Sequence, residues 1–218
     1  MVKQTEIALS DAAEWLGDWH PLAEQLGSAD GLITLGSASA QLCLGPAHNI
    51  STLRQLLRNY QARILLPLEL PAIESAHGHA THNETRELIA LDVQLAGETL
   101  LRKFAAASQR VGQYQLQKLR PLRDQRLVQR YLAAVESGEA RGWHTLVYGI
   151  TLAIYSLPLR QGLLGYAHQT TRSFIYSAAR SLALSENQCR RLFDTVTRDL
   201  PAAVDSLLRE KAAAYPQT

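Results

Sequence analysis

The sequence predicts an all-α protein, and three observations carry this prediction. Apolar residues recur at three- and four-residue spacing along most of the 218-residue chain, which is typical of amphipathic helices. No segment shows the alternating apolar and polar residues of a half-buried strand. Prolines, glycines and N-cap residues interrupt the apolar segments at intervals that suit helices. We therefore expect a compact single-domain bundle of about eight to ten helices over residues 1–218, with 1–9 and 212–218 frayed.

The N-terminal quarter predicts two helices around a segment of small residues. Asp11 and Glu14 form an N-cap pair for a first helix, which carries Trp15, Leu16, Trp19 and Leu22. The Gly-, Ser- and Ala-rich segment 27–45 indicates either a closely packed helix or one broken near Gly36. Asn49 or Ser51 then caps a helix whose apolar face consists of Leu53, Leu56, Leu57, Tyr60 and Ile64.

The middle of the chain predicts a helix boundary and a central helix. Pro67 and Pro71 indicate the boundary, because proline lacks an amide hydrogen and clashes with the preceding helical turn. From Asn83 to about Ala107, two apolar stripes predict one helix that is buried on more than one side. They are formed by Leu88, Leu91 and Leu95, and by Val93, Ala96, Leu100 and Phe104.

Later helices follow from similar signals. A shorter helix is expected over 108–118, with a joint at Pro121, and another over 127–135 that ends at Ser137-Gly138. Two long apolar helices are expected next, the first ending near Pro158. Ser185 and Gln188 predict a capping box that opens the final helix, which Pro201 kinks or restarts.

Composition excludes several classes of protein. Hydrophobic residues make up 46% of the chain and charged residues 19%, which is ordinary for a folded domain. The formal net charge is only +2, so nucleic acid and anionic membranes are not expected partners. The two cysteines, Cys43 and Cys189, are far apart and suggest neither a disulfide framework nor a zinc finger. With no apolar leader at the N-terminus and no run of transmembrane length, a cytoplasmic location is expected.

A histidine cluster is the one constellation that suggests a metal ion. His77, His79 and His82 lie within six residues, with Glu74 and Glu84 nearby, and imidazole suits nickel and zinc. Residues two apart point away from each other on a helix, and Gly78 indicates a loop between helices, where solvated histidines are ordinary. The cluster is therefore compatible with two alternatives: transient nickel binding at the surface, and no metal binding. Glu74 and His77 match half of a di-metal signature, but the chain has no second copy.

Enzyme motifs are absent from the sequence. It contains no nucleophile elbow, no phosphate-binding loop with its lysine and no dinucleotide fingerprint. Asp92 and Glu98 are the obvious mid-helix acids, and their separation of six residues does not place them on one helical face. An all-α small-molecule enzyme is therefore a minor alternative. The arginines at 120, 123, 126 and 130 are interpreted as a solvated face rather than a binding surface.

Several short motifs follow one another along the chain: Leu66 to Ala72, Leu91-Asp92 with Arg102, Ala107-Ser108 and Gly112, Trp143 to Gly149, Leu164 with Arg172, and Ser177 to Arg180. Taken in this order, they resemble the motifs of the urease accessory protein family UreF. Each is unspecific alone, but their order and approximate distances hold from about residue 30 to 195. Two segments depart from the family pattern: the N-terminal motif is reduced to 36–42, and the Pro-Leu-Gly-Gln turn reads as 183–186.

The resemblance implies a divergent, non-enzymatic member of this family. Such a helical homodimer would act as a scaffold or chaperone between a UreD/UreH-type protein and a UreG-type GTPase, which together insert nickel into apo-urease. It implies no cofactor of its own, because nickel is handled transiently by the complex. The expected partner contacts are Ser37, Ser39 and Gln41 in the reduced motif and Arg180, Glu186 and Gln188 at the polar turn. A dimeric regulatory scaffold unrelated to urease is the alternative.

Overall fold

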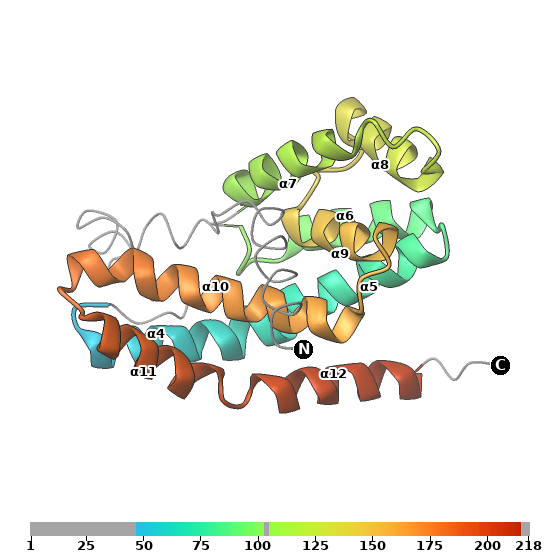
Figure 1. Cartoon of the computed structure of the whole chain (residues 1–218). Coiled ribbons are helices and arrows are strands. Elements are labelled where there is room, and N and C mark those ends of the chain that lie inside the picture. The colour runs from blue at the N-terminus through green and yellow to red at the C-terminus, as the bar shows by residue number, and fades with distance from the viewer. Residues whose placement is uncertain (1–46, 103–104, 215–218) are drawn as a thin grey trace. The chain divides into compact units, whose positions relative to one another are not determined.

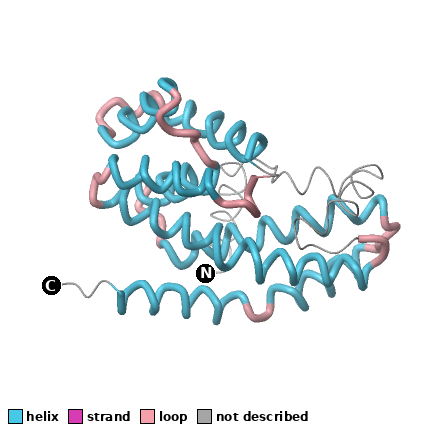
Figure 2. The backbone as a smooth tube through the Cα atoms, turned by 180° about the vertical axis from the view of Figure 1, so that it is seen from behind, coloured by secondary structure: helices cyan, strands magenta, loops and turns pink. Residues whose placement is uncertain are grey.

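The computed structural model describes residues 47–102 and 105–214. These residues form helices joined by turns, with no strand among them (Figure 2), so the predicted all-α class is confirmed. The first predicted helix, the segment 27–45, the end 1–9 and residues 215–218 lie outside the described residues. The expectation that 212–218 is frayed is wrong for 212–214, which continue the last helix, Leu200–Ala214. None of the described helices is both long and apolar enough to cross a membrane.

The described residues belong to two compact units. The first includes 72–159, and the second includes the described residues up to Pro71 and those from Arg160 onward. Whether the chain forms the single domain expected for 1–218 stays a prediction.

The first unit contains most of α5 (Leu70–Thr81), α6 (Thr85–Gly97), α7 (Ala105–Leu119), α8 (Arg126–Ser137) and α9 (His144–Ile154) (Figure 1). Within it α7 packs on α9, and α8 packs on both α6 and α7. The apolar faces of these helices are buried, including Leu88, Leu116, Val128, Leu146 and Ile150. Gly138 ends α8 in the left-handed conformation, with φ of 82°, which confirms the predicted end of that helix.

Two glycines let α9 and the segment before it approach neighbouring helices closely, Gly112 at the contact with α7 and Gly149 at the contact with α5. A Cβ atom added at Gly112 would overlap the backbone of the segment that leads into α9, lying 2.6 Å from the amide nitrogen of His144. One added at Gly149 would lie 2.9 Å from Cβ of Ala76 on α5. Both glycines therefore let helical backbones approach to distances that any larger residue would prevent.

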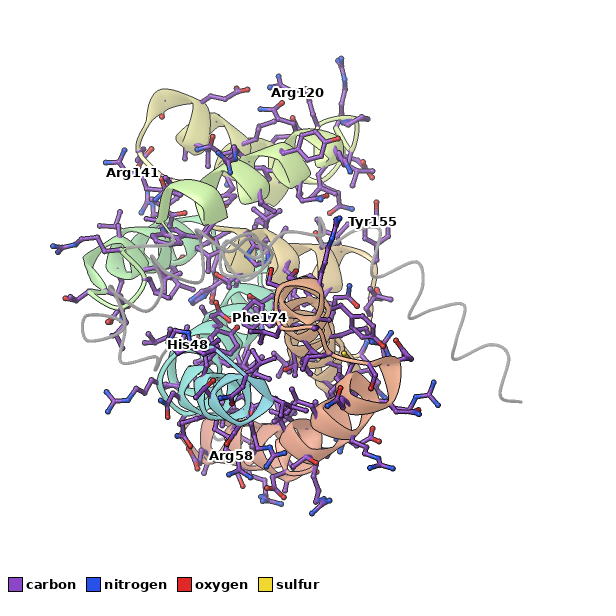
Figure 3. All side chains as sticks on the ribbon, turned by 90° about the vertical axis from the view of Figure 1, so that its left-hand side faces the viewer. His48, Arg58, Arg120, Arg141, Tyr155 and Phe174 are labelled. Atoms are coloured by element: carbon purple, nitrogen blue, oxygen red, sulfur yellow. The ribbon has the colours of Figure 1, made fainter. Side chains whose placement is uncertain are left out.

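The second unit contains α4 (Ile50–Tyr60), the π-helix η1 (Gln61–Glu69), α10 (Leu159–Ser181) from Arg160 onward, α11 (Glu186–Thr197) and α12 (Leu200–Ala214). Asn49 opens α4 with a capping box. Of the two predicted N-cap residues, Asn49 and Ser51, the first is therefore correct. The ring of Phe174 on α10 meets that of Tyr60 edge-on at 4.9 Å, and Figure 3 shows Phe174 among the helices of this unit. This aromatic pair forms part of the packing of α10 on α4.

Three predictions about the middle of the chain are wrong. The helical backbone continues through Pro67, because the wider π-helical turn of η1 accommodates it, and Pro71 occupies the first turn of α5, where proline is tolerated. The helix expected from Asn83 to Ala107 stops at Gly97, and Glu98 adopts an extended ψ of 113°. Val93 on the second apolar stripe is 57% exposed, so α6 is not buried on both sides.

Candidate functional site

The polar turn between α10 and α11 is fixed by its own hydrogen bonds. Ala183 adopts the left-handed conformation, with φ of 50°, and reverses the chain after α10. Ser185 then caps α11: its hydroxyl accepts from the amide of Gln188, whose side-chain oxygen accepts from the amide of Ser185 at 2.8 Å. This is the predicted capping box, and it directs α11 back along α10 (Figure 1).

A groove of about 550 Å³ lies between α10 and α11 within the second unit. Helix α10 contributes Gln169, Arg172, Ser173 and Tyr176, and helix α11 contributes Glu186, Arg190 and Phe193. The spacing explains this lining, because residues three and four apart share one face of a helix. Two neighbouring helices thus present polar and aromatic side chains to the same space.

Phe193 of α11 is held by two side chains of α10. The guanidinium of Arg172 lies 5.4 Å from the centre of the half-buried Phe193 ring, within cation–π distance. The His168 ring meets the same phenyl ring edge-on, with 5.7 Å between centroids. Burial lowers the pKa of His168, and the charge of Arg172 lowers it further, so a neutral imidazole is favoured here.

Two lining residues of the groove, Tyr176 and Glu186, are joined by a hydrogen bond across the turn. The hydroxyl of Tyr176 donates to Oε1 of Glu186 at 2.6 Å. This bond raises the pKa of Tyr176, because the carboxylate accepts from the protonated phenol, and the Glu186 charge adds to the effect. Tyr176 is nevertheless 44% exposed, so the pair lies at the surface of the groove.

Within the described part of the chain, the two arginines of the groove form no ion pair with an acid. Both of them, Arg172 and Arg190, are exposed. The charged lining therefore consists of two unpaired guanidinium groups and one carboxylate that already binds a phenol. Such a surface is suited to binding carboxylates rather than to acid–base catalysis.

Some of the residues predicted to contact a partner lie at or near the groove. Glu186 lines the groove, Arg180 is exposed at the end of α10, and the side chain of Gln188 is engaged in the cap of α11. Ser37, Ser39 and Gln41 lie outside the described residues. A role for any of the six in binding a partner stays a prediction.

Sequence reasoning missed the contributions of Arg172, Arg190 and Phe193 to the groove. The four-residue spacing of Arg172, Tyr176 and Arg180 could have indicated one polar face on α10. Nothing in the sequence could have shown that Phe193 on the next helix packs beneath that face.

The loop that Gly78 suggested is wrong for His77 and His79, which lie within α5, while His82 lies in the turn that follows this helix. Nδ1 of His79 is 2.8 Å from a carboxylate oxygen of Glu84, and Nδ1 of His82 is 2.9 Å from the carbonyl oxygen of Gly78. Half-burial lowers the pKa of His77, opposed by the charge of Glu74. Within the described part of the chain, no three His, Cys, Asp or Glu side chains are placed to share a metal ion. Nickel binding by this cluster stays a prediction.

Asp92 and Glu98, the acids considered for the enzyme alternative, lie at positions where they support the fold. Asp92 is fully buried and accepts hydrogen bonds from the Tyr131 hydroxyl and from the amides of Arg141 and Gly142. Glu98 lies at the C-terminal cap of α6. Asp92 is thus a buried acceptor for three donors, and it organises the loop that precedes α9.

Comparison with known proteins identifies the family. A family model described as UreF matches residues 47–196, which is most of the chain. The chain belongs to the UreF family. A protein of Arthrobacter sp. (strain FB24) named urease accessory protein UreF is 27% identical over 119 residues. The aligned stretch covers 55% of this chain and 53% of that relative, so the chain spans about half the length of the curated relative that it matches.

The UreF match includes both helices that form the groove. Helix α10 lies wholly within residues 47–196, and α11 lies within them except for Thr197. The groove therefore lies within the part of the chain that the UreF family model matches.

Proposed function

We propose that this UreF-family chain is a urease accessory protein that acts as a non-enzymatic scaffold. In this role it bridges a UreD/UreH-type protein and a UreG-type GTPase during nickel insertion into apo-urease. The UreF match over residues 47–196 is the observation that carries the proposal. The protein works as a homodimer in the cytoplasm and holds no cofactor of its own.

The character of the candidate site supports a scaffold. Its charged groups are exposed arginines and a carboxylate bound to Tyr176, and the buried Asp92 accepts hydrogen bonds from Tyr131 and from two backbone amides. Arginine and tyrosine are frequent anchors of protein interfaces. A surface of this kind recognises a partner without changing any covalent bond.

The scaffold acts through differential affinity. A partner GTPase changes conformation with its nucleotide and metal, and a scaffold shifts that equilibrium only by binding one form more tightly than the other. We assign GTPase contacts to Arg180 and Glu186 at the polar turn, with Gln188 holding the turn in shape. Ser37, Ser39 and Gln41 complete the contact surface in this proposal.

Complementation tests the function directly. The gene is placed in a urease cluster that lacks its own F-type subunit, and urease activity is assayed with nickel present. Restored activity is expected. A soluble, helical protein that restores no activity would refute the urease role and favour a scaffold that serves other partners.

The contact residues are tested by recruitment of the GTPase. Arg180→Ala combined with Glu186→Ala should weaken co-purification of the UreG-type protein while the melting temperature changes little. Arg209→Ala is a suitable control, because Arg209 is an exposed arginine on α12, away from the turn. Equal recruitment by wild type, double variant and control would refute these contacts.

A further inference from the structure

We propose that the groove between α10 and α11 binds an acidic segment of a partner protein. Arg172 and Arg190 contact carboxylates of that segment, and the Phe193 ring contacts an apolar side chain next to them. The inference deepens the scaffold function, on which it rests, by naming the chemistry of the bound segment.

The positions of Arg172 and Arg190 indicate that the groove binds carboxylates. Arg172 projects from α10 and Arg190 from α11, so the groove presents a guanidinium group from each of its walls. Neither is paired with an acid among the described residues, and both are exposed. A guanidinium binds a carboxylate through two parallel hydrogen bonds, which gives this surface directional preference for acidic side chains.

The ring of Phe193 indicates that the groove also binds an apolar side chain. Its centre lies 5.4 Å from the Arg172 guanidinium, and the ring also contacts His168 edge-on, which limits its movement. An arginine already ordered against an aromatic ring loses less side-chain entropy when it binds a carboxylate. The half-buried ring also offers apolar surface to a neighbouring residue of the bound segment.

The Tyr176–Glu186 pair favours a protein segment over a phosphate chain. Glu186 places a negative charge in the lining, held there by the 2.6 Å bond from the Tyr176 hydroxyl. A polyphosphate or nucleic-acid backbone would meet this charge and only two cations, in a chain whose net charge is +2. A mixed segment with separated carboxylates can bind both arginines and avoid Glu186.

The site is tested by fluorescence anisotropy with a defined probe. The probe is a short fluorescein-labelled peptide in which glutamates flank a central leucine, and the matched peptide has glutamine in place of each glutamate. We expect wild-type protein to bind the acidic peptide and to bind the glutamine peptide at least roughly tenfold more weakly.

Charge reversal then locates the binding. Arg172→Glu with Arg190→Glu should weaken binding of the acidic peptide by roughly tenfold or more. The matched control, Arg191→Glu with Arg198→Glu, changes the net charge equally at exposed positions that do not line the groove, and should bind like wild type. Arg172→Lys with Arg190→Lys should give intermediate binding, because charge remains while the planar fork is lost. Circular dichroism establishes that each variant is folded.

Four results would overturn the proposal. They are absence of peptide binding by the folded wild type, equal weakening by the groove and control variants, displacement of the peptide by equimolar tripolyphosphate, and conversion of a wild-type dimer to monomer by the groove variant alone. The last would identify a second copy of this chain as the occupant. The complementation assay separates the two proposals: restored urease activity without peptide binding refutes only the groove, and peptide binding without restored activity refutes only the urease role.

Discussion

Asp92 on α6 and Tyr131 on α8 are joined by a buried hydrogen bond of 2.6 Å. The same carboxylate accepts from the amides of Arg141 at 2.6 Å and Gly142 at 2.9 Å, just before α9 begins. Burial and the adjacent Asp92 charge raise the pKa of Tyr131, so the phenol stays protonated and continues to donate. One carboxylate thereby ties the loop that precedes α9 to two helices of the first unit.

Replacing this carboxylate should destabilise the protein. In Asp92→Asn the amide retains one acceptor oxygen and turns an NH₂ group toward N–H donors, so we expect the free energy of unfolding to fall by about 2–3 kcal/mol. Tyr131→Phe removes only one of the three bonds and should cost less. Urea denaturation followed by circular dichroism measures both changes, with the exposed Asp194→Asn on α11 as the control. Equal stability of Asp92→Asn and the control would contradict this account.

A methyl group at Gly112 should be poorly tolerated. The added Cβ would meet the backbone of residues 142–144, including the carbonyl carbon of Trp143 at 2.7 Å, and backbone at a helix contact has little freedom to move. We expect Gly112→Ala to destabilise the protein by about 1–3 kcal/mol, the usual range for overpacking. The melting temperature and the urea midpoint should both decrease.

Gly78 provides the matched control for this substitution. It also lies within a helix, α5, but an added Cβ would meet nothing within 4 Å. Gly78→Ala should therefore leave stability unchanged or raise it by up to about 1 kcal/mol, the difference in helix propensity. If the alanine variants at 78 and 112 had the same stability, the close approach at Gly112 would not be limiting.

The parts of the fold that the sequence predicted depend on local chemistry. The Asn49 and Ser185 caps and the Gly138 terminus are set by hydrogen bonds and backbone conformations within a few residues of each position. The end of α6 at Gly97 was missed because the apolar pattern continues beyond it. Passage of the helix through Pro67 was missed because a π-helix is a rare solution that proline does not itself indicate.

The candidate site was less predictable, because it depends on contacts between helices. Tyr176 and Glu186 are ten residues apart and meet only because Ala183 reverses the chain between them. Arg172 and Phe193 are likewise brought together by the antiparallel packing of α10 and α11. The resemblance to UreF identified the family from the order of its motifs, but it pointed to the turn and not to the groove beside it.

Stability should decrease as the pH falls through the range in which histidine protonates. The pKa of His168 is lowered from its ordinary value of 6.5 by burial and by Arg172, so the unfolded state binds a proton more readily than the folded state. The stabilisation is therefore fully present above pH 6.5 and is lost as the pH falls below it toward the folded pKa. His168→Gln should lose less stability between about pH 7 and pH 5 than wild type does. Urea midpoints across this range measure the effect, and parallel curves for the two proteins would refute it.

Nickel should bind weakly at the end of α5, through His79 and His82. If each Nδ1 donates its hydrogen, to Glu84 and to the Gly78 carbonyl, each Nε2 keeps the lone pair that a metal requires. His79 lies in the last turn of α5 and His82 in the turn that follows it, and water or a partner must supply the other ligands.

Isothermal titration of the protein with Ni²⁺ distinguishes this cluster from the rest of the surface. We expect binding to be lost in His79→Ala with His82→Ala and retained in His48→Ala, which removes an exposed histidine outside the cluster. Because a two-histidine site holds no part of the core, the double variant should keep the wild-type melting temperature in the absence of nickel. Unchanged Ni²⁺ binding by the double variant would exclude this pair as the ligands.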